Sequence, residues 1–371
     1  MMTIAIIKKR RDQNILIEHN EYIDFSSNDY LGMAQSKQLM DHMKDAVDAY
    51  GMGATGSRRL SGNHQVMRET EGVYSKWLQK DDAVLFNSGF QMNVGLFKAL
   101  FKKNTTIIAD KLIHASLIDG ILGSGCNLLR FNHNNMHQLE VCLKKAPKNT
   151  PCVIVCEALY SMDGDTPNLD TLIRLKKQYG AQLMLDEAHS IGLYGPNGQG
   201  LAYSQGVIKD IDYLLITFGK AFGLSGGMFL ANQQHIDTLR GMCRSYIYST
   251  ALPLPIVSTI GYACSVITDA HTQRNALFNN IKTFNQLCNV PGHPLYNSPI
   301  QALIIGDKEP TTEHHLQLLK NGMYVRPIHH PTVPKGASRL RITLTAQHTP
   351  ENIKKVTGYL ATHCNPSEGA L

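Results

Sequence analysis

The chain has 371 residues, of which 43% are hydrophobic and 18% charged, a composition typical of globular proteins large enough for two domains. Its net charge of +6 favours an anionic substrate or cofactor, but no dense basic stripe interleaved with aromatics is present, so nucleic-acid binding is not expected. The eight cysteines form no CxxC pair or zinc-ligand spacing, and no apolar run approaches the roughly 18 residues that span a membrane. The apolar N-terminal stretch precedes a basic cluster, the reverse of a secretory signal. We therefore expect a reduced, cytoplasmic protein without a metal site or membrane contact.

The predicted elements indicate an α/β fold. Residues 1–34 are expected to form a hairpin or loop that packs on a smaller C-terminal domain. A large domain over 35–255 follows, in which short apolar runs alternate with helical patterns, as in a mostly parallel sheet covered by helices on both faces. The predicted strands are 83–86, 105–109, 127–131, 152–157, 182–186, 213–217 and 227–231. A leucine and isoleucine stripe over 168–179 predicts a helix, with Asn168 as its N-cap.

The pattern changes after Pro253 and Pro255, where a second, smaller α/β domain over 256–371 is predicted. A helical stretch extends to about Leu287. It is followed by a strand at 302–305, a helix near 313–321 and a strand at 340–344.

Two familiar motifs do not have the context that they require. Residues 51–56 match GxGxxG, but helical spacing precedes them, whereas the dinucleotide fingerprint follows a strand. The DEAH segment at 186–189 resembles a helicase box, yet no GxxxxGK[ST] loop is present to hold a triphosphate. Neither nucleotide-binding function is therefore predicted.

Lys220 and Asp186 together indicate a site for pyridoxal phosphate (PLP). Lys220 lies in a glycine-flanked turn after the strand at 213–217, among small and apolar residues that would desolvate its amine. Asp186 ends the strand at 182–186, where burial of an unpaired carboxylate would be costly, so a cationic partner is required. A lysine can form a Schiff base with PLP, and a carboxylate can pair with its pyridinium nitrogen.

A phosphate site is predicted where the strand at 83–86 meets a helix that extends to about Phe101. Backbone N–H groups of Ser88, Gly89 and Phe90 would point at an anion there, aided by the helix dipole. An ordinary strand–helix turn would explain this segment equally well if it stood alone. Thr217, three residues before Lys220, has a hydroxyl that could reach the same phosphate.

Other polar residues have two interpretations each. His189 could hydrogen-bond the cofactor's 3-hydroxyl and His114 could stack on its ring, but either could equally be a structural histidine. In the segment 339–344, Leu340, Ile342 and Leu344 would face the core, leaving the two arginines and Thr343 on the other face. An arginine aimed into a cleft can bind a substrate carboxylate, and alternation does not tell Arg339 from Arg341.

Taken together, these segments resemble the α-oxoamine synthase family of fold-type I PLP enzymes over nearly the whole chain. The matching segments, in order, are FSSNDYLG, GSRRLSGN, NSGFQMN, DKLIHASL, SMDGD, LMLDEAHS, ITFGKAFG, YIYSTALP, PTVPKG and SRLRIT. Within the family, the first two and the run PTVPKGASRLR look most like the biotin-pathway branch. That branch implies decarboxylative condensation of L-alanine with pimeloyl-CoA. Glycine with acetyl-CoA, or a non-catalytic subunit that retains the fold, are the alternatives.

The resemblance also implies a role for each matching residue. Lys220 would form the Schiff base, Asp186 would pair with the pyridinium, and His114 would stack on the ring. His189 and Ser161 would contact the 3-hydroxyl side, and Asn28 and Arg341 would bind the amino acid's carboxylate. In a homodimer, the phosphate would be held by Gly89, Phe90 and Thr217 of one chain. Ser249 and Thr250 of the segment YSTALP would reach it from the partner subunit.

Two departures from the family pattern concern the substrate. His329 stands where relatives often carry an arginine before PPTVP, so a group that is mostly neutral at pH 7 replaces one associated with carboxylate binding. The amino terminus is shorter than in many relatives by about twenty residues, which removes a helix that can help to bind the acyl chain. We expect His329 to line the acyl or carboxylate pocket.

Overall fold

A computed structural model describes residues 5–291 and 293–364, and the chain divides into two compact units. The larger unit comprises 36–160 and 166–269. The smaller unit comprises 161–165 together with the described parts of 1–35 and 270–371. Within the described ranges, no helix is both long and apolar enough to cross a lipid bilayer.

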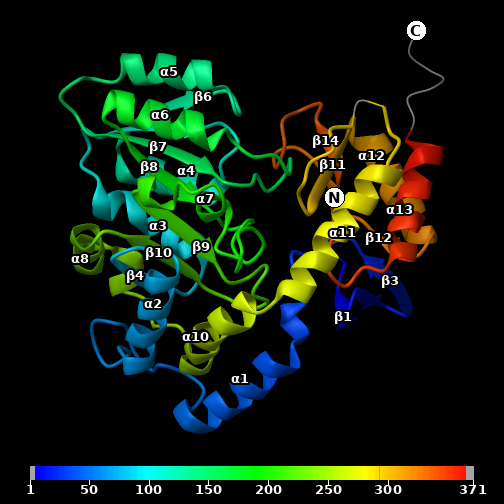
Figure 1. Cartoon of the computed structure of the whole chain (residues 1–371), viewed down its shortest axis with the longest axis horizontal. Helices are drawn as coiled ribbons and strands as arrows, with labels where there is room; N and C mark the ends of the chain where they lie inside the picture. Colours follow the sequence, from blue (N-terminus) through cyan, green and yellow to red (C-terminus); the bar gives the residue numbers. More distant parts are fainter. Residues whose placement is uncertain (1–4, 292, 365–371) are drawn as a thin grey trace. The chain divides into compact units, whose positions relative to one another are not determined.

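A seven-stranded sheet with helices on both faces forms the larger unit (Figure 1). Five neighbouring strands, in the order β9-β8-β7-β5-β6, are parallel, while β10 is antiparallel to both β9 and β4. The predicted α/β class and mostly parallel sheet are therefore confirmed. The strands are β4 (Asp82–Phe86), β5 (Thr106–Asp110), β6 (Asn127–Phe131), β7 (Cys152–Glu157), β8 (Gln182–Asp186), β9 (Tyr213–Thr217) and β10 (Gly227–Ala231).

Helices connect these strands, and the signals that delimit them are local. Asn168 caps α6, since its side chain accepts a hydrogen bond from the Thr171 N–H at 2.9 Å, as predicted. The GxGxxG segment follows α1 and not a strand, which agrees with its rejection as a dinucleotide site. The helices are α1 (Lys37–Tyr50), α2 (Gln65–Trp77), α3 (Gly89–Leu100), α4 (Ala115–Ser124), α5 (Met136–Lys145), α6 (Leu169–Tyr179), α7 (Leu201–Ser204), α8 (Gln233–Met242), α9 (Arg244–Ile247) and α10 (Leu254–Thr268), with a 3-10 turn at Ile208–Asp210.

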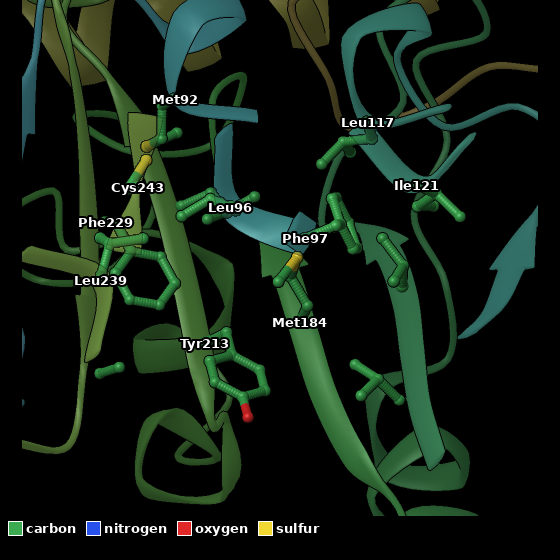
Figure 2. Packing of buried hydrophobic residues seen from close by; sticks show 14 of the residues in the cluster. Met92, Leu96, Phe97, Leu117, Ile121, Met184, Tyr213, Phe229, Leu239 and Cys243 are labelled. Atoms are coloured by element: carbon green, nitrogen blue, oxygen red, sulfur yellow. The ribbon is translucent and has the colours of Figure 1, made fainter. Parts of the chain in front are cut away.

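The core of this unit is packed between the sheet and helices α3, α4 and α8. Figure 2 shows Leu96 and Phe97 of α3 beside Met184 of β8 and Tyr213 of β9, all of them buried. The close approach of α3 and α4 requires a glycine at 120, because a Cβ there would lie 2.3 Å from the Asn93 carbonyl oxygen. The first turns of α3 and α4 therefore lie at the carboxyl ends of the strands that precede them, β4 and β5.

In its described residues, the smaller unit contains two short sheets and three helices longer than one turn. The N-terminal segment forms three antiparallel strands, one more than a hairpin, and β3 pairs in parallel with β12. The second sheet has the order β11-β14-β13. The elements are β1 (Ile7–Arg11), β2 (Asn14–Ile17), β3 (Asn20–Asp24), β11 (Ile300–Gly306), β12 (Met323–Tyr324), β13 (Pro327–Ile328), β14 (Ser338–Thr343), α11 (His271–Leu287), α12 (Lys308–Lys320) and α13 (Pro350–His363), with a 3-10 turn at Met33–Gln35.

The division between the units lies later in the chain than expected. The helical stretch predicted up to Leu287 is two helices, α10 and α11, separated at Asp269 and Ala270. α10 belongs to the larger unit because it packs on α2: the Tyr74 hydroxyl donates to the Ile260 carbonyl at 2.9 Å. The expected boundary between 255 and 256 therefore moves to 269 and 270.

Candidate active site

Lys220 lies in a hydrogen-bonded turn that follows β9. Phe218 and Phe222 are fully buried on either side of it, and the Gly223 N–H donates to the Lys220 carbonyl at 2.9 Å. The amine itself is half-buried and donates to the Thr217 hydroxyl at 3.4 Å. The turn therefore presents the lysine amine beside two buried aromatic residues.

Asp186 and Lys220 both lie at the carboxyl ends of the parallel strands. Asp186 ends β8, where it pairs with Leu215 of the parallel neighbour β9, and it is only 5% exposed. Burial raises the pKa of this carboxyl above its ordinary value. The positive charge of Lys220 and a hydrogen bond from the Ala188 N–H at 2.9 Å act in the opposite direction. A buried carboxylate that its neighbours compensate incompletely favours a cation bound beside it.

His114 begins α4, just after β5. Its Nδ1 accepts the Ser116 N–H at 3.2 Å and lies 2.7 Å from the Ser116 hydroxyl. As a whole residue His114 is exposed, but partial burial of the ring lowers its pKa, aided by the nearby Lys220 charge; Asp186 and Asp119 raise it. The side chain is thus an accessible, neutral imidazole at neutral pH.

The turn predicted to bind phosphate lies at the start of α3. Ser88 is the N-cap and accepts the Gln91 N–H at 3.1 Å. Because a helix offers no intrahelical acceptor to the N–H groups of its first turn, the N–H groups of Gly89 and Phe90 remain available to an anion. A Cβ on Gly89 would lie 2.6 Å from the Thr217 methyl carbon, so only glycine allows this close approach. Phe90 is 54% exposed. The predicted residues Ser88, Gly89 and Thr217 are therefore brought together in a small cradle suited to an anion.

His189 and Glu187 occupy the turn after Asp186. His189 is 6% exposed, so it is a buried polar residue three positions from the carboxylate. Glu187, which the sequence analysis did not single out, accepts the Leu201 and Ala202 N–H groups at 2.9 and 2.7 Å. These bonds tie the glycine-rich loop 192–200 to the site. The glycine run itself was the signal that could have identified this anchor.

Arg341 is the centre of a second cluster, in the smaller unit. It is 6% exposed and donates to the Ser161 carbonyl at 2.6 Å, the Thr343 hydroxyl at 2.8 Å and the Asn28 amide oxygen at 3.0 Å. These partners are all uncharged, so the guanidinium keeps a positive charge available to an anion.

Arg339 differs from Arg341 in its partner. It donates to the Asp163 carboxylate at 2.6 Å and is therefore paired within the protein. Arg341, whose recorded hydrogen-bond partners are uncharged, therefore differs from Arg339 in having no acidic partner among the described contacts. Every residue of β14 is buried, so the face that carries the two arginines and Thr343 is buried as well as the face that carries the apolar residues.

His329 is not joined to the Arg341 cluster by any hydrogen bond recorded in the described part of the smaller unit. Its Nε2 lies 3.4 Å from the Thr312 hydroxyl of α12. Burial lowers the pKa of His329, and the Lys308 and Arg326 cations lower it further, against the effect of Glu309.

Ser249 and Thr250 follow α9 in the larger unit. The Thr250 carbonyl accepts the Asn87 side-chain N–H at 2.8 Å, and Thr250 also bridges to Ser57 of the same chain. Thr250 is itself exposed. Over residues 5–291 and 293–364, no three His, Cys, Asp or Glu side chains converge as metal ligands would.

Comparisons with known proteins agree with this chemistry. The family model for class I and II aminotransferases matches residues 20–360. An 8-amino-7-oxononanoate synthase of Aliivibrio fischeri is 35% identical over 95% of this chain and 91% of its own length. One from Vibrio atlanticus is 37% identical over 96% of this chain and 88% of its own length.

Solved structures give the same picture. A serine palmitoyltransferase from S. paucimobilis with a bound PLP–myriocin aldimine has a TM-score of 0.93 and 29% identity, covering 97% of this chain and 92% of that chain. An 8-amino-7-oxononanoate synthase from Francisella tularensis has a TM-score of 0.81 and 28% identity, covering 92% and 98%. Both similarities extend over almost the entire chain.

Proposed function

Because the chain belongs to the class I and II aminotransferase family, and is a PLP-dependent enzyme of fold type I, we propose that it condenses L-alanine with pimeloyl-CoA. The products are 8-amino-7-oxononanoate, CoA and CO2. The observation that carries the proposal is the position of Lys220 and the buried Asp186 after neighbouring parallel strands, close enough for the charge of Lys220 to lower the pKa of Asp186, in a chain whose relatives carry this activity in their names.

The residues of the larger unit fit PLP. The glycine cradle at the start of α3 suits a phosphate, and Asp186 suits a protonated ring nitrogen. When bound, PLP supplies an electron sink for the charge left at the amino acid's α-carbon by loss of a proton or of CO2. Asp186 would keep the ring nitrogen protonated, His114 would pack on the ring, and His189 and Ser161 would contact the 3-hydroxyl of the cofactor.

Lys220 moves the proton in this proposal. Its amine takes the α-proton of alanine as general base and returns a proton to the same carbon after CO2 is lost. The buried aromatic residues Phe218 and Phe222 support the turn and keep water from one side of the lysine. Thr217 would donate to the phosphate, and its hydroxyl accepts a hydrogen bond from the free Lys220 amine.

Arg341 and Asn28 bind the carboxylate of alanine. The support for this role is that the Arg341 guanidinium is buried and has only uncharged hydrogen-bond partners among the described residues. His329 lines the acyl pocket, where its lowered pKa keeps it neutral at pH 7.

The working enzyme is proposed to be a cytoplasmic homodimer, in which Ser249 and Thr250 reach the phosphate of the partner subunit. Three large apolar side chains of the larger unit support an interface between copies of the chain. Met52, Leu60 and Tyr248 are 79%, 80% and 72% exposed. Apolar side chains of this size are common at subunit interfaces.

A second candidate uses serine and a long-chain acyl-CoA. It is favoured by the TM-score of 0.93 to serine palmitoyltransferase, against 0.81 to the oxononanoate synthase structure. The first candidate is supported by the sequence identities of 35% and 37% to the oxononanoate synthases of Aliivibrio fischeri and Vibrio atlanticus.

The test measures CoA release by the PLP-loaded enzyme with three substrate pairs: alanine and pimeloyl-CoA, glycine and acetyl-CoA, and serine and palmitoyl-CoA. We expect the first pair to react fastest and to yield a product of the mass of 8-amino-7-oxononanoate. Faster release with either other pair would replace this substrate assignment. Absence of release with all three would overturn the proposal that acyl-CoA is the donor.

A further inference from the structure

Asn93 and Ser116 lie between two residues of the proposed cofactor site, His114 and Asp186. Asn93 lies on α3 and is 3% exposed, and Ser116 lies in the first turn of α4 and is fully buried. The Asn93 Nδ2 donates to the Ser116 hydroxyl oxygen at 2.9 Å. That hydroxyl oxygen lies 2.7 Å from Nδ1 of His114. The side chains of Asn93, Ser116 and His114 therefore form one continuous hydrogen-bonded chain.

The direction of each hydrogen bond follows from the groups involved. An amide NH₂ can only donate, so the Ser116 oxygen accepts from Asn93 and its own proton is free to be donated. His114 Nδ1 already accepts the Ser116 backbone N–H at 3.2 Å, so this nitrogen carries a lone pair. The Ser116 hydroxyl must then donate to Nδ1 as well. The imidazole proton is left on Nε2.

The orientation of the Asn93 amide is supported by Asp186. A carboxylate can only accept hydrogen bonds, so the amide must present its NH₂ group to it. This hydrogen bond from Asn93 lowers the pKa of Asp186, against the larger raising effect of burial. Asn93 thus serves the carboxylate and the histidine with the same donor group.

We propose that Asn93 and Ser116 are positioning residues that lock His114 as the Nε2-protonated, neutral tautomer with its ring in one orientation. This inference rests on the proposed function, in which His114 packs on the PLP ring. A neutral imidazole can lie against a protonated pyridine ring, whereas an imidazolium would repel it. The two donors at Nδ1 disfavour a proton there, because that proton would face the Ser116 N–H.

The test reads the tautomer directly in the dimeric holoenzyme labelled with ¹⁵N-histidine, with the His114 signals assigned by their loss in His114→Asn. In the wild type we expect Nδ1 to have the shift of an unprotonated nitrogen and Nε2 that of a protonated one. Ser116→Ala should produce a mixture of the two tautomers. It should also weaken PLP binding about 5- to 10-fold, measured by titration of the cofactor's visible absorbance.

Ser124→Ala is the matched control, since Ser124 is a buried serine of the same helix whose hydroxyl donates to the Ile121 carbonyl. It should change neither the tautomer nor PLP affinity. Asn93→Leu provides a second variant, expected to give the same tautomer mixture as Ser116→Ala. A wild type with its proton on Nδ1, or a Ser116→Ala spectrum identical to that of the wild type, would overturn the inference.

The same spectra separate this inference from the proposed function. Adding PLP to the apoenzyme should shift the His114 ring signals if the cofactor lies against the imidazole. An unchanged His114 signal on PLP binding would contradict the proposed role of His114. The tautomer of the apoenzyme would still decide whether Asn93 and Ser116 fix the proton on Nε2.

Discussion

Two buried carboxylates in the larger unit have opposite surroundings. Glu71 is fully buried and is met by Arg58, Arg68 and Arg240 at 2.9, 2.6 and 3.4 Å, with the Leu85 N–H at 3.0 Å. Asp186 is also buried, but burial outweighs its partners and raises its pKa. A carboxylate that is saturated with partners stabilises the fold, whereas one that is left short of partners can bind a ligand. The contrast can be tested by mutation.

The largest expected effect is at Lys220, the cation beside Asp186. Lys220→Ala should reduce CoA release by at least about 10⁴-fold, because the general base and the covalent attachment point are both lost. The half-buried side chain contributes little to the core, so the melting temperature of the apoenzyme should hardly change. Lys209→Ala, at an exposed lysine of the same unit, is the control and should retain full activity. Substantial turnover by Lys220→Ala would remove the lysine from the mechanism.

Glu71→Ala tests the saturated carboxylate. It leaves three arginine side chains, one of them buried together with Glu71, without their anion, so we expect a loss of about 3–5 kcal/mol in the free energy of unfolding. Urea unfolding of the apoenzyme measures it. Glu69→Ala, on the exposed side of the same helix, should change stability by less than about 0.5 kcal/mol. Similar values for the two variants would mean that the arginine network is not structural.

Asp186→Asn tests the carboxylate whose partners do not outweigh its burial. The amide keeps its acceptor for the Ala188 N–H but removes a buried charge, so apoenzyme stability should stay within about 1 kcal/mol of the wild type. Turnover should fall about 10³-fold, since the ring nitrogen loses its anion. Glu187→Gln is the informative counterpart, because its carboxylate accepts two backbone N–H groups; it should lose about 1–3 kcal/mol of stability. Strong destabilisation by Asp186→Asn would mean that Asp186, like Glu71, stabilises the fold.

Features of the fold and of the candidate site could be predicted from the sequence where neighbouring residues determine them. Strands such as 152–157 and 182–186 were predicted with the bounds that the structure has, because apolar runs with turn signals at each end are typical of buried strands. The break between α10 and α11 was missed because helical periodicity continues across Asp269 and Ala270. Lys220 and Asp186 were identified because a charged residue is unusual at each position, one in an apolar, glycine-flanked turn and the other at the end of a buried strand.

Tertiary contacts account for what the sequence did not decide. Arg339 and Arg341 lie two residues apart on β14 and so share one face of the strand, which the sequence pattern cannot resolve. The carboxylate of Asp163, which pairs with Arg339, distinguishes them. Asn93 and Ser116 are ordinary helical residues until α3 and α4 pack together. Such pairings depend on side chains far apart in the sequence, about which periodicity carries no information.

His348 is a third buried titratable group, and its two ring nitrogens can both form their hydrogen bonds only when the imidazole is neutral. Its Nδ1 accepts the Thr345 N–H at 3.0 Å, its Nε2 donates to the Asp24 carbonyl at 3.1 Å, and its ring stacks on Phe25 with centroids 4.4 Å apart. Burial lowers the pKa of His348 to about 4, from an ordinary 6.5. A proton on Nδ1 would face the Thr345 N–H, so the folded state resists protonation.

The lowered pKa of His348 predicts a pH dependence of stability. Between about pH 6.5 and pH 4 the unfolded chain binds a proton at His348 that the folded chain does not, so the free energy of unfolding should fall as the pH is lowered. The full loss approaches about 3 kcal/mol near pH 4, and above pH 6.5 this contribution is constant. Urea unfolding at pH 7.5, 6 and 5 for the wild type and His348→Gln isolates it, because the other histidines are common to both proteins. Since the glutamine side chain cannot titrate, the difference in stability between the two proteins should shrink as the pH falls; a constant difference would show that His348 is protonated in the folded state at the same pH as in the unfolded chain.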